Sequence, residues 1–188
     1  MREANDLAQA RLLRLIAEKD RRALAELYDE MASPLFAVSV RILGDPQEAE
    51  EVVQDVFVEI WNKAAAFDQS LGTAFHWTMS ILRNRSIDRL RLRQRRSRII
   101  DRLQEFAPAG AAEAEMQPVP GLGVDETARI HAAVKCLPDE QRRVLEMAFF
   151  NGQTHAEIVE STGEPLGTVK ARIRRGLLRL RSVLQEYA

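Results

Sequence analysis

The sequence predicts an all-α protein built from two small helical domains that a flexible linker joins. Apolar residues recur at three- and four-residue spacing through most of the chain, as they do on amphipathic helices, and no segment alternates with the period of two that marks a strand. Pro and Gly gather between residues 103 and 124, where no regular element can continue. The length of 188 residues suits one domain or two small ones.

The first domain is predicted for residues 1–102. Its first clear helix carries an apolar repeat at Leu24, Leu27, Tyr28, Met31 and Leu35. A turn follows, in which Asp45 suits the N-cap and Pro46 the first helical position of a helix over 47–61. That helix has a wide apolar stripe made of Val52, Val53, Val56, Phe57, Ile60 and Trp61. The composition of "FDQSLGT" (67–73) predicts a loop, and a further helix begins near Ala74.

The linker and the second domain, 125–188, follow. Three Pro and three Gly in "LQEFAPAGAAEAEMQPVPGLGV" (103–124) predict a flexible segment. Apolar periodicity returns at Ile130, Val134 and Leu137, and Pro138 opens a new helix. "TGEP" (162–165) then separates helical patterns over 154–161 and 166–187. The spacing of Val159, Gly163 and Val169 suits a helix-turn-helix, whose second helix would bury Val169, Ile173, Leu177, Leu180 and Leu184.

Charge is segregated along the chain, although the formal net charge is only −1. "TVKARIRRGLLRLR" (168–181) has one Lys and five Arg without an acid, and "LRNRSIDRLRLRQRRSRIIDR" (82–102) has nine Arg. In contrast, "GDPQEAEEVVQDVFVEIW" (44–61) has six acids and no base. Two cationic surfaces on a nearly neutral chain suggest one polyanion bound at two places. The alternative is that the Arg-rich helices are merely solvated faces.

Several protein classes are excluded by what the sequence lacks. No apolar run approaches the roughly 20 residues of a membrane span, and the first residues do not form a secretory signal, so we expect a cytoplasmic protein without membrane insertion. Cys136 is the only cysteine, so no internal disulfide can form. We interpret His131 and Cys136 as ordinary helix residues and expect no metal and no cofactor. Phosphate-loop and nucleophile motifs of enzymes are missing too.

Two residues of the first Arg-rich block point to single-stranded nucleic acid. Trp77 and Asn84 are seven residues apart and therefore share a helical face. An aromatic residue beside a loop, followed by Arg and Asn, suits a stacking platform with a clamp for the sugar–phosphate backbone. The alternatives are core packing for Trp77 and an ordinary surface position for Asn84. The Arg-rich second helix of the helix-turn-helix is instead typical of a major-groove reader.

These motifs resemble a known family. "PLGTVKARIRRGLLRLR" and "ILRNRSIDRLR", supported by "EAEEVVQDVFVEIW", are similar to regions 4 and 2 of extracytoplasmic-function (ECF) RNA polymerase sigma factors. The resemblance covers about 23–96 and 125–181, with all motifs in the family's order. Three positions depart from the usual pattern: Val159 replaces Ala, Glu164 replaces an apolar residue, and Ala171 replaces Ser.

The resemblance implies roles for particular residues. The helix over 47–61 would dock on the β′ clamp of core RNA polymerase, and we assign its acidic face to this contact: Glu48, Glu51, Asp55 and Glu59. The loop over 67–73 would capture a flipped base of the −10 element with Asp68, Gln69, Ser70 and Leu71. The helix that follows it would hold the melted strand with Trp77, Arg83, Asn84 and Arg85. Region 4 would meet the β flap and read the −35 element of promoter DNA with Thr168, Lys170, Ala171, Arg172, Arg174 and Arg175.

The remaining implications concern the linker and regulation. The linker resembles the segment that threads the active-site cleft and the RNA exit channel of the polymerase. "FFNGQTH" and "STGEPLG" resemble a subgroup controlled by cupin-type or related anti-sigma factors, so we expect an anti-sigma partner.

Two alternatives remain open at this point. A dimeric helix-turn-helix repressor or activator, acting without core polymerase, would explain 168–181 but would leave the acidic helix and the first Arg block without a role. The acidic face of 47–61 has its own alternative, because charge runs are often only solvated.

Overall fold

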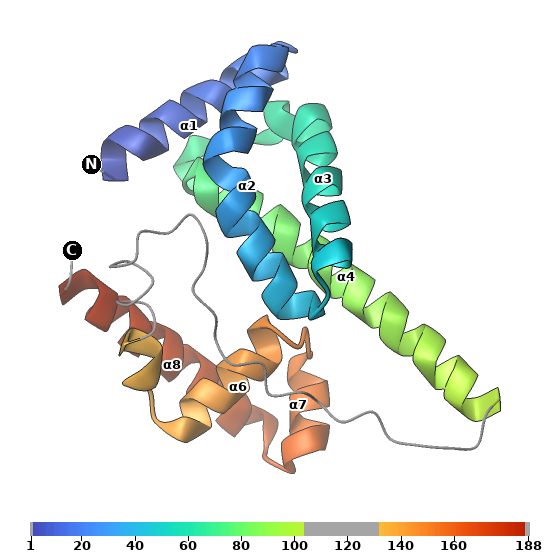
Figure 1. Cartoon of the computed structure of the whole chain (residues 1–188). Coiled ribbons are helices and arrows are strands. Elements are labelled where there is room, and N and C mark those ends of the chain that lie inside the picture. Colours follow the sequence, from blue (N-terminus) through green and yellow to red (C-terminus); the bar gives the residue numbers. More distant parts are fainter. Residues whose placement is uncertain (1, 104–131, 187–188) are drawn as a thin grey trace. The chain divides into compact units, whose positions relative to one another are not determined.

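The computed structural model describes residues 2–103 and 132–186, and all regular elements in these ranges are helices, which confirms the all-α prediction (Figure 1). The chain divides into two compact units, Met1–Gly121 and Leu122–Ala188, each treated by itself below. Apart from Leu103, the linker predicted for 103–124 lies outside the described residues, as does Ile130.

The first unit holds α1 (Arg2–Ala17), α2 (Arg21–Leu43), α3 (Pro46–Lys63) and α4 (Ala74–Leu103), with 3₁₀ turns η1 (Ala64–Ala66) and η2 (Gln69–Leu71) between α3 and α4. Asp45 caps α3 as predicted, because its Oδ1 accepts hydrogen bonds from the backbone N–H of Gln47 at 2.8 Å and of Glu48 at 3.3 Å. Gly44 ends α2 in the left-handed region, with φ of 70°.

The core of the first unit lies where α2 packs against α3 and α4, with α1 packed on all three. Leu27, Met31 and Leu35 of the predicted stripe are buried. Tyr28 from the same stripe remains 43% exposed, and its ring contacts that of Phe57 with 4.8 Å between centroids. The helix that follows the loop, α4, packs against this buried apolar core.

The second unit contains α6 (Asp139–Phe149), α7 (His155–Thr162) and α8 (Leu166–Glu186). Each helix contributes one fully buried side chain to the centre of the core, namely Val144, Ile158 and Val169. Partly buried apolar residues surround this centre: Met147, Ala148, Val159 and Ile173.

The prediction that Leu177 is buried in α8 is wrong. Leu177 is 54% exposed, whereas its neighbour Gly176 is buried. A Cβ atom at Gly176 would lie only 2.7 Å from Cδ1 of Leu145 on α6. The two helices therefore lie close together at Gly176, and Leu177, the next residue of α8, lies on the exposed side of the helix. Leu184, the last residue of the predicted stripe, is among the side chains outside the description.

Candidate nucleic-acid interface

The helix-turn-helix forms through local hydrogen bonds that its sequence encodes. Thr154 and Glu157 form a capping box at the start of α7: the Thr154 hydroxyl accepts from the Glu157 N–H at 3.2 Å, and the Glu157 carboxylate accepts from the Thr154 N–H at 2.6 Å. Gly163 ends α7 with φ of 71°, and its N–H donates to the Val159 carbonyl at 2.8 Å. The turn predicted at 162–165 is confirmed.

The outer face of α8 presents cations without ion-pair partners. Lys170, Arg174 and Arg175 are exposed, and none of them forms a salt bridge within the described residues. Thr168 and Ala171, also assigned to this face from the sequence, are half-buried. Unpaired guanidinium and ammonium groups on one helical face can bind phosphate oxygens and the acceptor atoms of guanine.

Arg172 differs from these three cations because it has carboxylate partners within the second unit, and its assignment to the −35 element stays a prediction. Its guanidinium forms ion pairs with Glu164 in the turn and with Glu140 of α6, the latter at 2.9 Å. Its side chain is only 21% exposed. Arg172 thus ties α8 to the turn and to α6. Glu164 is one of the departures from the family pattern, and helical periodicity did not predict its pairing with Arg172.

An ion-pair ladder joins α3 to α4 in the first unit. Glu48 pairs with Arg93 at 3.3 Å, Glu51 with Arg89 at 2.9 Å, and Glu59 with Arg85 at 2.6 Å. Arg93 also donates to the carbonyl of Leu43, the last residue of α2, at 2.8 Å.

The ladder gives three of the four acids assigned to polymerase a partner inside the first unit, and the assignment of all four to polymerase stays a prediction. Glu48, Glu51 and Glu59 each pair with an Arg of α4, and the Glu59 side chain is only 13% exposed, whereas that of Glu51 is 63% exposed. Asp55 is exposed and has no salt bridge within the described residues. Part of the acidic block therefore neutralises the first Arg block inside the same unit.

Among the acids of the ladder, Glu59 is the one whose pKa is clearly shifted by its neighbours. A hydrogen bond from Lys63 Nζ, at 2.6 Å, and a second one from Arg85 lower the pKa of Glu59, although burial acts in the opposite direction. The same contact with Glu59 raises the pKa of Arg85. Arg83, also assigned to DNA binding from the sequence, is half-buried, and its pKa is lowered by desolvation and by the nearby charge of Arg91.

The proposed stacking platform lies at the edge of the core. Trp77 is half-buried and packs edge-on against Phe67, with 5.7 Å between ring centroids. Asn84, two turns further along α4, is exposed. One side of the indole is thus held by the protein, and its assignment to the opened strand stays a prediction.

The loop before α4 is organised by Asp68. Its carboxylate accepts a hydrogen bond from the Ser70 N–H at 2.8 Å, and the hydrogen bonds from the Ser70 side chain and backbone lower the pKa of Asp68. Asp68 therefore caps η2, which leaves the next three residues exposed, Leu71 to 87%. Asp68 therefore stabilises the loop, whereas Gln69, Ser70 and Leu71 are exposed to solvent.

Lys19 is a structural residue that sequence reasoning missed. It adopts the left-handed conformation with φ of 68°, donates from Nζ to the carbonyl of Trp61 at 2.7 Å, and lies 5.0 Å from the centroid of that indole. It fastens the turn between α1 and α2 to the end of α3. Hydrophobic periodicity could not predict this contact, because it depends on a single residue in a turn.

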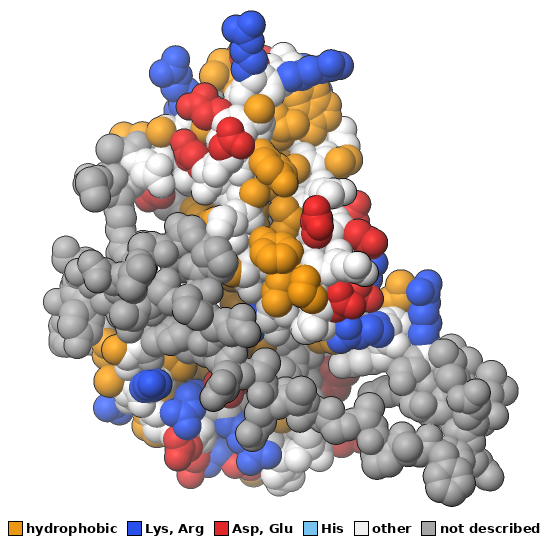
Figure 2. Space-filling view, viewed as in Figure 1, with side chains coloured by type: hydrophobic (Ala, Val, Ile, Leu, Met, Phe, Trp, Pro, Cys, Tyr) orange, Lys and Arg blue, Asp and Glu red, His pale blue; other side chains and the backbone are white. Residues whose placement is uncertain are grey.

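The surface of the first unit also has an apolar region. Figure 2 shows a band of hydrophobic side chains along α2 and α3, with acidic side chains at its edges. Tyr28 is 43% exposed and Val58 61%. Within the described residues no helix is long and apolar enough to cross a membrane, and no cluster of His, Cys, Asp and Glu could hold a metal ion.

The first unit thus carries an Arg-rich helix and the second unit a helix-turn-helix, an arrangement that is typical of DNA-binding proteins. The Sigma-70 region 2 family model matches residues 27–96, and the model for Sigma-70, region 4 matches residues 127–180. The ECF RNA polymerase sigma factor SigK of Mycolicibacterium vanbaalenii is 32% identical over 173 residues, covering 92% of this chain and 87% of that protein. SigK of Mycobacterium tuberculosis is 32% identical over 175 residues, covering 92% and 91%.

Solved structures of similar proteins include Rhodobacter sphaeroides SigE in complex with the anti-sigma ChrR, which is 31% identical and covers 94% of this chain and 98% of that one, with a TM-score of 0.46. CnrH in complex with the cytosolic domain of CnrY is 21% identical, with a TM-score of 0.42 and coverage of 96% and 99%.

The chain belongs to the sigma-70 family and is an ECF RNA polymerase sigma factor, which confirms the resemblance found in the sequence. It is a transcription-initiation factor that acts with core RNA polymerase at promoters. The reading as a helix-turn-helix regulator that works without polymerase is not favoured, because it does not account for the region 2 match.

Proposed function

We propose that the two units of this sigma factor divide promoter recognition between them, with α8 reading the −35 element and α4 with its preceding loop holding the opened −10 strand. The observation that carries the first half is the group of exposed cations at Lys170, Arg174 and Arg175 on α8, in a helix-turn-helix whose first helix is capped at both ends. Arg172 then acts as an internal brace that fixes the angle of α8 rather than as a reader of bases.

For region 2, the support comes from the ladder between α3 and α4. The ladder directs Arg85, Arg89 and Arg93 toward α3, so it fixes the rotation of α4 about its axis. That rotation leaves Asn84 exposed and Trp77 partly accessible beside the loop. A fixed aromatic and amide pair suits a melted strand, which offers unstacked bases and no regular groove.

For polymerase docking on the β′ clamp, we propose that α3 uses Asp55 and the exposed Val58, and that the exposed Tyr28 of α2 adds to the contact. Asp55→Arg should weaken the affinity for core polymerase, because the new cation would face the basic partner proposed for this acid, and like charges at an interface slow association. Glu51→Gln is the matched control, since Glu51 is paired with Arg89 within the unit. Wild-type affinity of a folded Asp55→Arg protein in fluorescence anisotropy would remove this acid from the interface.

The remaining parts of the proposal concern regulation and location. Rhodobacter sphaeroides SigE, 31% identical to this chain, was solved with the anti-sigma ChrR, and we propose an anti-sigma partner for this chain as well. We place the protein in the cytoplasm with the polymerase, as a subunit without an enzymatic reaction of its own. Region 4 would contact the β flap, and the segment 103–124 would link the units through the polymerase cleft.

Run-off transcription with core polymerase on a pool of genomic promoter fragments, with mapped start sites, tests this function. We expect start sites that share −35 and −10 elements. Arg174→Ala should reduce output roughly tenfold or more where the −35 element is needed, because one base-edge contact contributes about 1–3 kcal/mol. Arg179→Ala, on the same helix, should act weakly and equally on all promoters. Nanomolar sequence-specific binding by the free protein would support the polymerase-independent alternative instead.

A further inference from the structure

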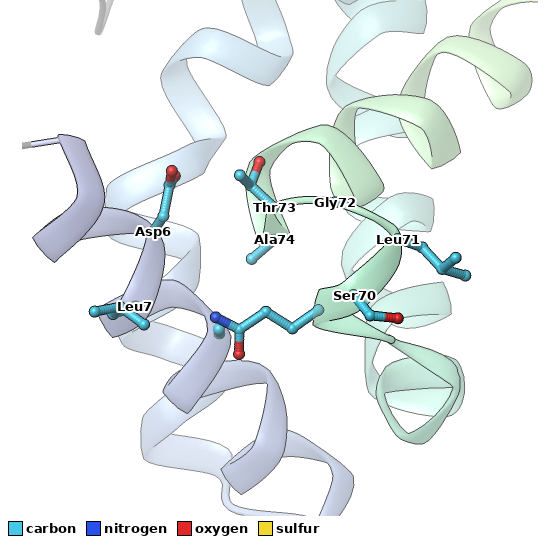
Figure 3. A pocket seen from close by; sticks show the side chains of 9 residues that line it. Asp6, Leu7, Ser70, Leu71, Gly72, Thr73 and Ala74 are labelled. Carbon is cyan, nitrogen blue, oxygen red and sulfur yellow. The ribbon is translucent and has the colours of Figure 1, made fainter.

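An exposed leucine lies within the cationic face of α8. Leu178 is 56% exposed, the highest value among the large apolar side chains in the described part of the second unit. A single exposed leucine is ordinary in a folded protein. Leu71 of the first unit, for example, lies at the cavity between α1 and the loop before α4, and its side chain points away from α1 (Figure 3). Leu178 differs from Leu71 in the charged residues that surround it.

The rotation of α8 places Leu178 on the side of the helix that faces away from the core. Gly176 is buried against Leu145 of α6, and Val169 is fully buried in the core of the unit. Because an α-helix turns by about 100° per residue, Leu178 lies roughly 200° beyond Gly176 and thus on the opposite side of α8. The separation from Val169 corresponds to about two and a half turns, which gives the same direction.

The neighbours of Leu178 on this side are residues proposed to read the −35 element. Arg174 lies four residues before Leu178 and Arg175 three residues before it, so both flank it on the helix surface. Ala171 lies seven residues before Leu178, on the same side of the helix. Arg174 and Arg175 are exposed and form no salt bridge within the described residues. The outer face of α8 thus has a short apolar strip, made of Ala171 and Leu178, between two unpaired cations.

A leucine at this position can recognise only an apolar feature of DNA. Its side chain has no hydrogen-bond donor or acceptor, so it binds neither phosphate oxygens nor the polar atoms of the base edges. The apolar group that base pairs present in the major groove is the C5 methyl of thymine. The flanking guanidinium groups favour DNA over an apolar protein pocket as the partner, because such a pocket would desolvate two charges without pairing them.

We propose that Leu178, together with Ala171, contacts the C5 methyl group of a thymine in the −35 element and adds a preference that the cations cannot supply. This inference rests on the proposed function of α8 in reading the −35 element. Arg174 and Arg175 attract phosphate oxygens and the acceptor atoms of guanine, whereas the apolar strip distinguishes thymine from cytosine, which lacks the methyl group. Leu178 is thus a specificity-determining residue outside the set assigned from the sequence.

The test replaces each thymine of the −35 element, one at a time, with deoxyuridine, which lacks only the C5 methyl group. Run-off transcription uses complete holoenzyme below saturation, where output follows promoter affinity. For the wild type we expect one position at which deoxyuridine lowers output roughly threefold to fourfold, as for the burial of one methyl group. Leu178→Ala should lower output from the thymine promoter by a similar factor and should remove the response to deoxyuridine. Leu178→Met keeps an apolar side chain and should retain most of the response.

Leu177→Ala is the matched control for Leu178→Ala. Leu177 is 54% exposed on the same helix, but it lies about 100° away from Leu178 and next to Ile173, which packs against the core. Leu177→Ala should therefore keep the full response to deoxyuridine. Circular dichroism shows whether each variant folds, and both leucines are exposed enough for the helix to tolerate alanine.

Two results would overturn the inference directly, namely no response to deoxyuridine in the wild type and an unchanged response in Leu178→Ala. A loss in Leu178→Ala that is equal with and without the methyl group, together with weaker binding of core polymerase, would assign Leu178 to a protein contact instead.

Arg174→Ala separates this inference from the proposed function of α8. If Arg174→Ala changes the dependence on the −35 element while deoxyuridine has no effect, only the role of Leu178 fails. If neither Arg174→Ala nor any change of the −35 sequence alters output, the role proposed for α8 fails as well.

Discussion

Replacing Glu59 with Gln should destabilise the first unit, because this carboxylate holds two cations from two different helices. It accepts from Lys63 Nζ within α3 and from Arg85 Nε of α4, both at 2.6 Å. Glutamine keeps the shape of the side chain but removes the charge that both donors need. The contact with α4 should therefore weaken without leaving a cavity.

The size of the expected loss of stability follows from how exposed the Glu59 side chain and its two cationic partners are. The Glu59 side chain is 13% exposed, but the side chains of Lys63 and Arg85 are 61% and 51% exposed and remain well hydrated. A hydrogen bond to a charged group contributes about 1.5–3 kcal/mol, and an exposed ion pair about 0.2–1 kcal/mol. We expect Glu59→Gln to lower the free energy of unfolding by about 1–2 kcal/mol, between these limits.

Tryptophan fluorescence isolates the first unit, because both Trp residues of the chain, Trp61 and Trp77, lie in it. Urea unfolding followed by this signal at pH 7 should show the loss in Glu59→Gln. Asp55→Asn, an exposed acid on the same helix, should stay close to the wild type. A double-mutant cycle with Arg85→Gln should return a coupling of about 0.5–1.5 kcal/mol for the pair.

The pH dependence provides a second measurement on the same proteins. Since the folded-state pKa of Glu59 lies below the ordinary value of 4.5, the carboxylate stabilises the folded state fully above that value. This contribution is lost as the pH falls through the folded pKa. The difference between the wild type and Glu59→Gln should therefore be largest near neutral pH and shrink below about pH 4.5. Equal stability at pH 7, or a difference that does not change with pH, would refute the role given to this ion pair.

Three further predictions follow from other contacts. Trp77→Ala holoenzyme should open duplex promoters poorly but regain much of its activity on a pre-melted template, because one stacking platform contributes about 1–3 kcal/mol; no rescue in a folded variant would assign Trp77 to the core. Arg172→Ala should speed hydrogen exchange across the second unit, reflecting a loss of about 1–2 kcal/mol, whereas Arg174→Ala should leave exchange unchanged. Gly176→Leu should cost about 1–3 kcal/mol by overpacking against α6, where an added Cβ already lies 2.7 Å from a Leu side chain, and Gly176→Ala should cost less in the same exchange measurement.

Helix positions and caps could be predicted from the sequence because they depend on neighbours along the chain. Asp45 before Pro46, and Gly163 between two apolar patterns, each fix a local backbone requirement that no distant contact overrides. The family resemblance rested on the same kind of local pattern. Leu177 shows the limit of periodicity, since the buried face of α8 was set by the close approach of α6 at Gly176 and not by the largest apolar residue nearby.

Charge partners could not be predicted in the same way, because a charged side chain can meet solvent, another helix or another molecule with the same sequence signature. The acids of α3 and the first Arg block were assigned from the sequence to two different outside partners. In the structure, Glu48, Glu51 and Glu59 pair with Arg residues of α4 that lie 26 to 45 residues further along the chain. Separation in sequence concealed a short distance in space.

This pairing changes what the Arg blocks imply about DNA. In α4, every Arg that faces α3 in the ladder has part of its charge offset by a carboxylate, so these residues contribute less to attraction for phosphate than their number suggests. In α8, Arg172 is offset in the same way, while Lys170, Arg174 and Arg175 form no salt bridge within the described residues. Duplex binding should therefore depend on a small set of cations on α8. Recognition of the opened strand should depend more on shape and stacking at Trp77 than on net charge.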